Sequence, residues 1–274
     1  MSDAVRGWVE AYRRAWEEMD ADAAAALFSE DATYRSLIFD EPNRGRDGIR
    51  AYWARATSNQ GDVAVTMGDP FIDGDRVAVE WWTTMLDTSE NEDLTLPGVL
   101  LLWFDPDGLC RSLREYWAFE PGRQEAFDGW GEKAPGDTEA TRDSAARWAA
   151  AYRTFWTAGD PNGAAERCAE EVIYRTGVLR DPEVGRDAVR KYTALAFESE
   201  DDRTVAFGRP FADDGTAAVE WWCTFTDLDE NPPAPATIAG CSIQTYDDDG
   251  LVLTSRDYWH FQADVHNPPE EWGT

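Results

Sequence analysis

The chain has 274 residues, enough for about two domains, and its 43% hydrophobic and 13% aromatic content favours packed domains over a disordered chain. The 54 acidic and 25 basic residues give a formal charge of -29, which disfavours nucleic acids and anionic membranes as partners because like charges repel. No window is long and apolar enough to cross a membrane, and the charged N-terminus lacks the apolar stretch of a signal peptide, so we expect a cytoplasmic protein.

The predicted elements run in the order of helices first and strands afterwards. An amphipathic helix carries Trp8, Tyr12 and Trp16 four residues apart, and an Ala-rich second helix ends near Phe28. A third helix begins at the GRD segment that starts with Gly45. Strands are expected at 31–36, 62–72, 75–86, 97–104 and 109–120, with IDGD and DPDG as connecting turns. This order predicts the α+β class.

The same motifs recur roughly 140 residues later. AVEWW stands at 78–82 and again at 218–222, GRDGIRAY is repeated as GRDAVRKY, and REYWAF is repeated as RDYWHF. A repeat of this length indicates a duplicated domain, since solenoid units span only about 20 to 50 residues. We predict one copy at 1–121 and a second at 143–274, joined by a linker at 122–142 that is rich in Gly, Pro and charge.

The LFSEDATY strand, the GRD helix start, the DPDGL hairpin and the final REYW strand resemble the nuclear transport factor 2-like superfamily, most closely its SnoaL-like and ketosteroid-isomerase-like branch. The resemblance covers nearly all of both copies. It implies two cone-shaped domains, each with about three helices on a strongly curved, mostly antiparallel sheet around a deep apolar pocket, paired as a pseudo-dimer. The superfamily contains isomerases, dehydratases, aldol cyclases and epoxide hydrolases as well as binding modules, so the pocket must indicate the function.

Alternation along a strand predicts which side chains of AVEWW enter the pocket. Glu80 and Trp82 share one face, whereas Val77, Val79 and Trp81 share the other. The second face is apolar, as a packing surface between sheets or domains should be, so we expect Glu80 and Trp82 to point inward. The equivalent residues of the second copy are Glu220 and Trp222.

The last strand of each copy supplies a second acid beside a tryptophan. Glu115 shares a face with Trp117, and Asp257 shares a face with Trp259. The resemblance implies that Glu115 and Asp257 fall where SnoaL-like cyclases carry their acid/base aspartate. Burial and mutual repulsion raise the pKa of carboxyls in an apolar pocket, which suits them to move a proton next to a carbonyl group.

The resemblance also implies roles for residues outside these strands. Tyr12 and Tyr152 occupy the helix position of the isomerase's oxyanion-hole tyrosine, although an apolar helical stripe equally suits them as core residues. The position of the isomerase's catalytic base holds Ser36 and Thr176, which departs from that machinery. The second oxyanion donor is replaced by Leu100 and Ser242, and the other expected ligand contacts are Tyr34 and Tyr174.

Two functions from different classes remain open at this stage. The first is a cofactor-independent isomerase, cyclase or lyase that acts on a hydrophobic, polyketide-like or terpenoid-like carbonyl compound. The second is a non-catalytic protein that binds a small molecule, with cations among the candidates because indole faces and buried acids attract positive charge. The carboxylates would then be held by structural pairings.

Few residues are available for metal or cofactor chemistry. The two histidines and four cysteines form no metal-ligand spacing, and no HExxH, GxSxG, P-loop or GxGxxG motif occurs. We therefore expect no metal, no cofactor, a small hydrophobic ligand as partner, and a chain that exists as a monomer or homodimer.

Overall fold

The computed structural model describes residues 2–274, which divide into two compact units between Lys133 and Ala134. This division falls inside the predicted linker at 122–142, and the last residues of that segment already belong to a helix that begins at Thr138. Within residues 2–274 no helix combines the length and the apolar character needed to cross a membrane. The pairing of the copies as a pseudo-dimer stays a prediction.

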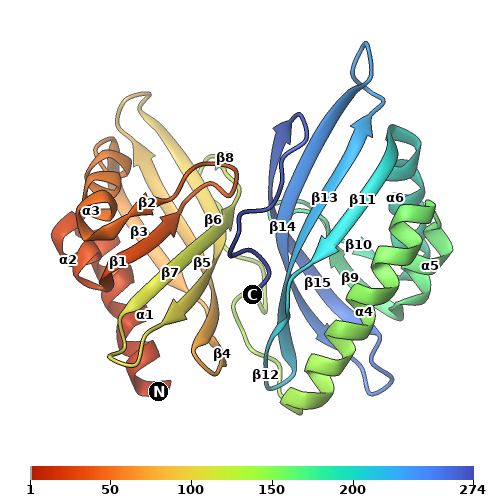
Figure 1. Cartoon of the computed structure of the whole chain (residues 1–274), viewed down its shortest axis with the longest axis horizontal. Coiled ribbons are helices and arrows are strands. Elements are labelled where there is room, and N and C mark those ends of the chain that lie inside the picture. Colours follow the sequence, from red (N-terminus) through yellow and green to blue (C-terminus); the bar gives the residue numbers. More distant parts are fainter. Residues whose placement is uncertain (1) are drawn as a thin grey trace. The chain divides into compact units, whose positions relative to one another are not determined.

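The first unit runs from helices into one curved sheet (Figure 1). Its helices are α1 (Ser2–Glu17), α2 (Ala21–Ala26) and α3 (Gly45–Ala56). Its strands are β1 (Phe28–Arg35), β2 (Asn43–Arg44), β3 (Gln60–Met67), β4 (Phe71–Asp73), β5 (Arg76–Asp87), β6 (Glu92–Phe104), β7 (Cys110–Trp117) and β8 (Glu120–Pro121). The sheet order is β2-β1-β7-β6-β5-β3, and every neighbouring pair in it is antiparallel except β1 with β7.

The second unit repeats this topology. Its helices are α4 (Thr138–Ala158), α5 (Pro161–Glu166) and α6 (Arg186–Ser199). Its strands are β9 (Cys168–Arg175), β10 (Glu183–Val184), β11 (Glu200–Phe207), β12 (Phe211–Asp213), β13 (Thr216–Asp227), β14 (Ala234–Tyr246) and β15 (Val252–Ala263). The order β10-β9-β15-β14-β13-β11 matches the first sheet strand for strand. The predicted duplication and the α+β class are confirmed.

Aspartate side chains start several of the helices. Asp20 caps α2 by accepting hydrogen bonds from the backbone N–H groups of the second and third residues after it, and Asp160 and Asp137 cap α5 and α4. Helix α4 ends at Gly159, whose φ of 66° is the left-handed conformation that glycine adopts without strain. These caps separate the first helix of each unit from the short second helix.

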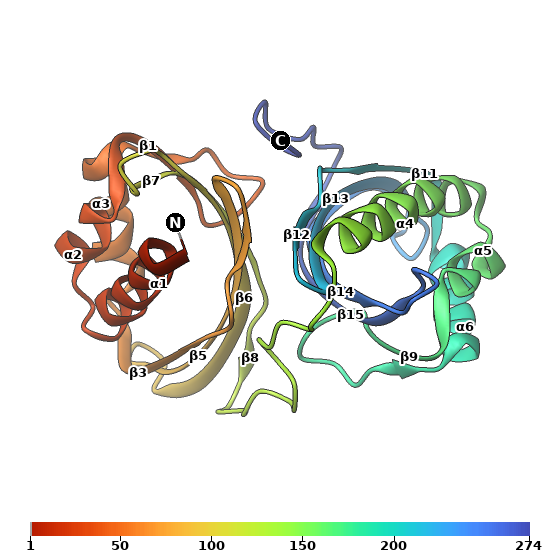
Figure 2. The ribbon, with the colours of Figure 1, turned by 90° about the horizontal axis from the view of Figure 1, so that it is seen from below.

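Helix α1 lies inside the curve of the first sheet, and α4 takes the same place in the second unit (Figure 2). Trp8, Tyr12 and Trp16 of α1 are buried in one hydrophobic cluster with Val79 and Trp81 of β5. The face of β5 that carries these apolar residues is therefore the inner one. The prediction that it faces outward is wrong, because its apolar side chains pack against the helix rather than against another sheet or domain.

A glycine on the neighbouring strand makes room for the inward tryptophan. Trp81 pairs with Gly98 of β6, and Trp221 pairs with Gly240 of β14. A Cβ atom at Gly98 would lie 2.4 Å from ring atoms of Trp81, and one at Gly240 would lie 2.5 Å from Trp221. Each indole therefore lies across the backbone of the adjacent strand, which only glycine permits at this distance.

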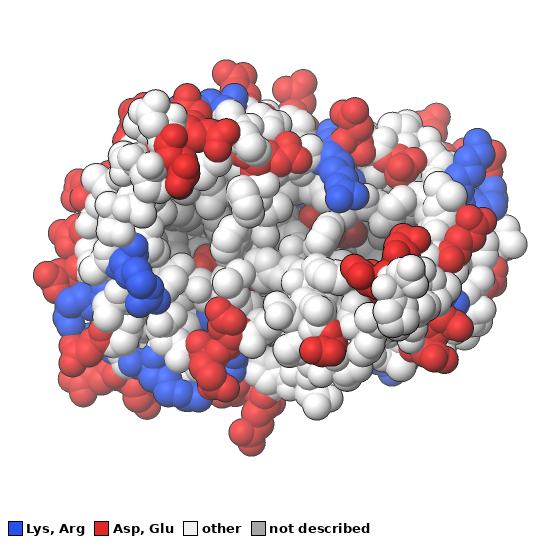
Figure 3. Space-filling model, turned by 90° about the horizontal axis from the view of Figure 1, so that it is seen from above, with Lys and Arg blue, Asp and Glu red and all other residues white. Residues whose placement is uncertain are grey.

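The excess of acidic residues is spread over the surface. Figure 3 shows Asp and Glu side chains scattered over the face in view, with fewer Lys and Arg between them. A distribution of this kind gives a general negative potential, which attracts cations without selecting one position.

Candidate functional site

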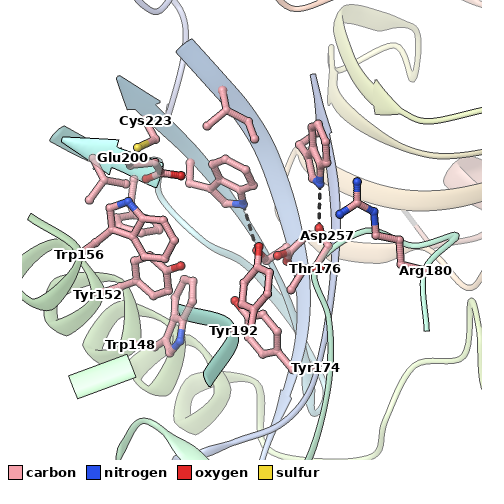
Figure 4. Close-up of a pocket in the computed structure, with 16 residues that line it drawn as sticks. Trp148, Tyr152, Trp156, Tyr174, Thr176, Arg180, Tyr192, Glu200, Cys223 and Asp257 are labelled. Carbon is pink, nitrogen blue, oxygen red and sulfur yellow. Dashed lines mark hydrogen bonds between the residues drawn. The ribbon is translucent and has the colours of Figure 1, made fainter. Parts of the chain in front are cut away.

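Each unit encloses a cavity between its helices and the inner face of its sheet. The first cavity measures about 210 Å³, and the second, which Figure 4 shows, measures about 110 Å³. Residues that line the first are Tyr12, Trp16, Tyr34, Tyr52, Trp53, Ala56, Thr57, Gln60, Trp81, Leu96, Glu115 and Trp117. Residues that line the second are Trp148, Tyr152, Trp156, Tyr174, Thr176, Arg180, Tyr192, Glu200, Val205, Phe207, Trp221, Cys223, Ile238, Ser242, Asp257 and Trp259.

A chain of hydroxyl groups leads to the carboxyl group of the first cavity. The Tyr34 hydroxyl donates to Oε1 of Glu115 at 3.0 Å, and the Tyr12 and Tyr34 hydroxyls lie 2.9 Å apart. The three side chains come from β1, β7 and α1, and each residue is no more than 4% exposed. Hydrogen bonds between side chains that are far apart in the sequence thus join α1, β1 and β7 at the Glu115 carboxyl.

Burial controls the protonation of this group. Loss of water raises the pKa of Glu115 from 4.5 to about 8, although the hydrogen bond from Tyr34 acts in the opposite direction. Burial and the neighbouring Glu115 also raise the pKa of Tyr12 and Tyr34 well above 10.0, so both phenols stay protonated. Near neutral pH the Glu115 carboxyl is mostly protonated and can exchange its proton with a ligand.

Two indole N–H groups in the wall of the first cavity have no acceptor. Nε1 of Trp53 and Nε1 of Trp81 are buried without a hydrogen-bond partner among the described residues. A buried donor without a partner costs free energy, commonly about 1 to 3 kcal/mol. A ligand oxygen within reach would recover part of that free energy.

The second cavity has Asp257 in the position of Glu115. Burial raises the pKa of Asp257 from 3.8 to about 7, while hydrogen bonds from Ser242 and Ser255 lower it. The Ser255 hydroxyl lies 3.5 Å from Oδ1 of Asp257. No hydrogen bond between Tyr174 and Asp257 occurs within residues 2–274, whereas Tyr34 reaches Glu115 in the first unit. The aspartate side chain is one methylene shorter, which accounts for the missing bond.

The second cavity also contains an acid that the sequence did not indicate. Glu200, the first residue of β11, lines it, and burial raises the pKa of Glu200 from 4.5 to about 7. The equivalent residue of the first unit is the neutral Gln60, whose Oε1 accepts from Trp16 Nε1 at 2.9 Å. In the second unit both Oε2 of Glu200 and Nε1 of Trp156 are buried without partners among the described residues.

Two of the predicted catalytic acids lie outside the cavities. Glu80 and Glu220 sit on the convex face, because their neighbours Trp81 and Trp221 face inward and side chains alternate along a strand. Their placement in the pocket, inferred from the apolar character of the opposite face, is wrong. That apolar face is the one that meets the helix.

Trp82 and Trp222, the tryptophans predicted to contact the ligand beside these acids, also lie outside the cavities. Trp82 donates from Nε1 to the carbonyl of Gln124 at 2.9 Å and packs edge-on against Trp130. Trp222 donates to the carbonyl of His266 at 3.0 Å. Both indoles therefore hold the segment that follows their own sheet, and neither lines a cavity.

The other predicted residues divide into two groups. Ser36 does not line the first cavity; its carbonyl accepts a hydrogen bond from Nε1 of Trp117 at 2.7 Å, which holds the Trp117 ring in the wall. Thr176 does line the second cavity, and its carbonyl accepts from Trp259 at 2.8 Å in the same way. Predicted residues that the structure places in a cavity wall are Tyr12, Tyr34, Glu115, Trp117, Tyr152, Tyr174, Thr176, Ser242, Asp257 and Trp259.

Several residues in the walls were missed. Tyr52 and Tyr192 end the repeated GRD motif, and their exact repetition was a usable signal for a shared role. Trp81 and Trp221 belong to the repeated AVEWW motif but were assigned to the other face. Glu200 had no such signal, because its counterpart Gln60 is not an acid and lies before the strand that was expected at 62–72.

No group of three or more His, Cys, Asp or Glu residues is arranged to hold a metal ion within residues 2–274. The described cysteines are buried and form no disulfide, and burial raises the pKa of Cys110, Cys168 and Cys223 to about 12. Their thiols are therefore protonated and poor nucleophiles. The titratable groups of the cavities are carboxyls and phenols, together with the Arg180 guanidinium and the Cys223 thiol of the second cavity.

Comparison with solved structures finds several that resemble part of this chain. A hypothetical protein of Catenulispora acidiphila with a ketosteroid isomerase-like fold, solved in complex with trimethylamine, is 25% identical over 40% of this chain and 83% of its own, with a TM-score of 0.37. SalBIII, an epoxide hydrolase/cyclase-like enzyme with a role in pyran ring formation in the polyether salinomycin, is 23% identical over 43% of this chain and 95% of its own, with a TM-score of 0.39. RV0760c of Mycobacterium tuberculosis is 17% identical over 44% of this chain and 98% of its own, with a TM-score of 0.40.

A search of curated protein sequences found no match. The SnoaL-like domain family matches twice, over residues 9–113 and 149–254, and the two matches coincide with the two units of the structure. The chain therefore belongs to the SnoaL-like domain family and carries two copies of that domain.

Proposed function

We propose that the protein is a cofactor-independent acid/base enzyme of the isomerase, cyclase or lyase type that acts on a small hydrophobic carbonyl compound. The observation that carries this proposal is a buried carboxyl at the same strand position of both cavities, Glu115 and Asp257, each facing aromatic walls. Membership of the SnoaL-like family agrees with it at the level of the family only.

The protonation of these groups suits proton transfer at neutral pH. A general acid or base works best when its pKa lies near the working pH, and the pKa of Glu115 is raised to about 8 and that of Asp257 to about 7. The ionised form removes a proton from the carbon next to a carbonyl group. The protonated form returns a proton to the resulting enol or enolate, so one carboxyl serves both half-reactions.

The walls offer donors for the oxygen that becomes negative. In the first cavity the buried N–H groups of Trp53 and Trp81 have no acceptor among the described residues, whereas the single hydroxyl proton of Tyr12 is donated to Tyr34, which itself donates to Glu115. Fixed donors in a site without water stabilise an enolate more than the ground-state carbonyl. Removal of one such donor from an enzyme typically costs about 10² to 10³ in rate.

The cavity volumes favour a small substrate. A dry protein cavity of about 150 Å³ accepts benzene. The first cavity, at about 210 Å³, matches a single substituted ring or a short branched chain, and the second, at about 110 Å³, matches a smaller molecule. Among the expected substrates, a short polyketide-like or a monocyclic terpenoid-like ketone fits better than a fused ring system.

Exchange of α-protons tests this proposal without knowledge of the natural substrate. Cyclic ketones and enones with one ring are incubated in D2O, and NMR follows the loss of the α-proton signals. We expect Glu115→Gln and Asp257→Asn each to slow the exchange in their own unit, by about 10²-fold for the loss of a general base. Glu92→Gln, which removes an exposed acid of β6, is the control.

Two results would contradict the proposal. Exchange that is no faster with the wild-type protein than in buffer across the panel counts against an acid/base site. Equal exchange by the wild type and by the double variant, with both folded by circular dichroism, would assign Glu115 and Asp257 to a structural role.

A further inference from the structure

We propose that the second cavity binds a small protonated amine through Glu200, and that the first cavity does not. This inference does not rest on the proposed reaction, because a binding site for an alkylammonium ion requires no turnover. It rests on the carboxyl group that the second cavity has and the first lacks.

One oxygen of the Glu200 carboxyl lacks a hydrogen-bond donor among the described residues. This atom, Oε2, is buried without a partner among the described residues, and Glu200 lines the cavity beside Trp156 and Cys223, across from Asp257 and Thr176 (Figure 4). A buried carboxylate costs free energy when it has neither a hydrogen-bond donor nor an opposite charge beside it. A ligand that carries an N–H group and a positive charge supplies both. A protonated amine carries both on one atom.

The nearest basic side chain does not fill this role. Arg203 lies on the same strand and its charge acts on Glu200, but its guanidinium donates to backbone carbonyls, from Nε to Trp156 at 3.1 Å and from Nη1 to Glu200 itself. It also packs over the ring of Phe197, 4.7 Å from the centroid. No ion pair between Arg203 and the Glu200 carboxylate occurs within residues 2–274.

Aromatic rings supply the rest of the site. The walls of the second cavity contain Trp148, Tyr152, Trp156, Tyr174, Tyr192, Phe207, Trp221 and Trp259. The faces of such rings attract an organic cation and at the same time bury its alkyl groups, and tryptophan does so best. The opposite wall carries a second carboxyl, Asp257, together with the Arg180 guanidinium, which also lines the cavity and bears the opposite charge.

The first cavity provides a natural comparison. It has a similar set of rings, but Gln60 replaces Glu200, and its amide oxygen is already bonded to Nε1 of Trp16 at 2.9 Å. The atoms left without partners in its wall include the two indole donors of Trp53 and Trp81, which repel a cation and suit an acceptor. Among the described residues, the first cavity wall thus leaves indole donors unpaired, whereas the second leaves an acceptor, Oε2 of Glu200, in addition to the Trp156 donor.

The cavity volume restricts the amine. A space of about 110 Å³ is smaller than the 150 Å³ or so that accepts benzene, so a primary ammonium ion with a chain of about three carbons is a suitable probe. n-Propylammonium has one N–H-bearing cationic end and an alkyl chain for the rings. n-Propanol has nearly the same shape without the charge and serves as its neutral counterpart.

Isothermal titration calorimetry of the full chain tests the proposal. We expect n-propylammonium to bind at one site per chain, and to bind at least about 10-fold more tightly than n-propanol, because only the cation pairs with Glu200. Glu200→Gln places in the second unit the side chain that the first unit carries at the equivalent position. We expect this substitution to weaken the binding of n-propylammonium by about 10-fold or more.

A matched control separates this site from the general negative charge. Glu198→Gln removes one acidic charge from the exposed surface of α6, two residues before Glu200, and we expect it to leave binding within about twofold of the wild type. Equal affinity of the wild type and Glu200→Gln for n-propylammonium would overturn the proposal, as would equal loss in both variants. The comparison with n-propanol needs no variant, so equal binding of the two probes by the wild type, or no binding of n-propylammonium, would overturn it even if Glu200→Gln failed to fold.

Discussion

Replacement of Glu115 by glutamine should change how the stability of the first unit depends on pH. The pKa of this acid is raised from 4.5 to about 8 by burial, so the folded protein keeps its proton over a range in which the unfolded chain has lost it. Stability that this group contributes at low pH is therefore lost as the pH rises through that range. The loss amounts to ~1.4 kcal/mol for each pH unit.

Glutamine keeps the shape and the acceptor oxygen of the side chain but does not titrate. Its Oε1 can still accept from Tyr34, which donates to Glu115 at 3.0 Å in the wild type. The variant should thus be close to the wild type near pH 5 and should become the more stable of the two as the pH approaches 8. We expect a difference in the free energy of unfolding that grows by ~1.4 kcal/mol per pH unit.

Urea denaturation at several pH values measures this difference. The transition that the substitution shifts identifies the first unit, since the two units need not unfold together. The exposed Glu92→Gln serves as the reference, because all other titrating groups are shared and cancel in the comparison. A difference between Glu115→Gln and the wild type that stays constant from pH 5 to 8 would refute the assignment of Glu115 as a buried, protonated acid.

Three further predictions concern the cavity walls. Gly98→Ala places a Cβ 2.4 Å from ring atoms of Trp81, so we expect a loss of about 1 to 3 kcal/mol in the free energy of unfolding and a change in the near-ultraviolet circular dichroism of the tryptophans. Tyr34→Phe removes the hydroxyl that donates to the Glu115 carboxylate, so the pKa of that acid should rise further, which the pH profile of ketone exchange or the 13C shift of the carboxyl carbon would detect. Glu80→Gln should leave ketone exchange within about twofold of the wild type, because the residue lies on the convex face of β5; a loss as large as that of Glu115→Gln would return Glu80 to the site.

Most of the fold could be predicted from local patterns. The spacing of Trp8, Tyr12 and Trp16 identified the helix that fills the sheet, because burial of one helical face requires that period. The turn residues of DPDG placed the hairpin between β6 and β7, and those of IDGD placed the turn between the short β4 and β5. The repeated motifs indicated two copies of one domain, and both the topology and the two family matches agree with this.

The candidate site was predicted only where alternation and the assignment of the face were both correct. On the last strand, Glu115 and Asp257 lie in the walls as expected. On β5 and β13 the alternation was right but the face was reversed, so Trp81 and Trp221 replace Glu80 and Glu220 in the walls. Strand periodicity gives which residues share a face, and it does not give which face meets the helix.

The sequence by itself determined the duplication, the order of helices and strands, and the acids on β7 and β15, because these depend on period, turn chemistry and repetition along the chain. The tertiary structure alone decided which side of each sheet is enclosed, that Tyr12, Tyr34 and Glu115 form one hydrogen-bonded chain, and that Glu200 faces an aromatic cavity while Gln60 is bonded to Trp16. The physical reason is that burial and hydrogen bonding between distant segments depend on how the sheet curves around its helix, and the curvature is a property of all its strands together.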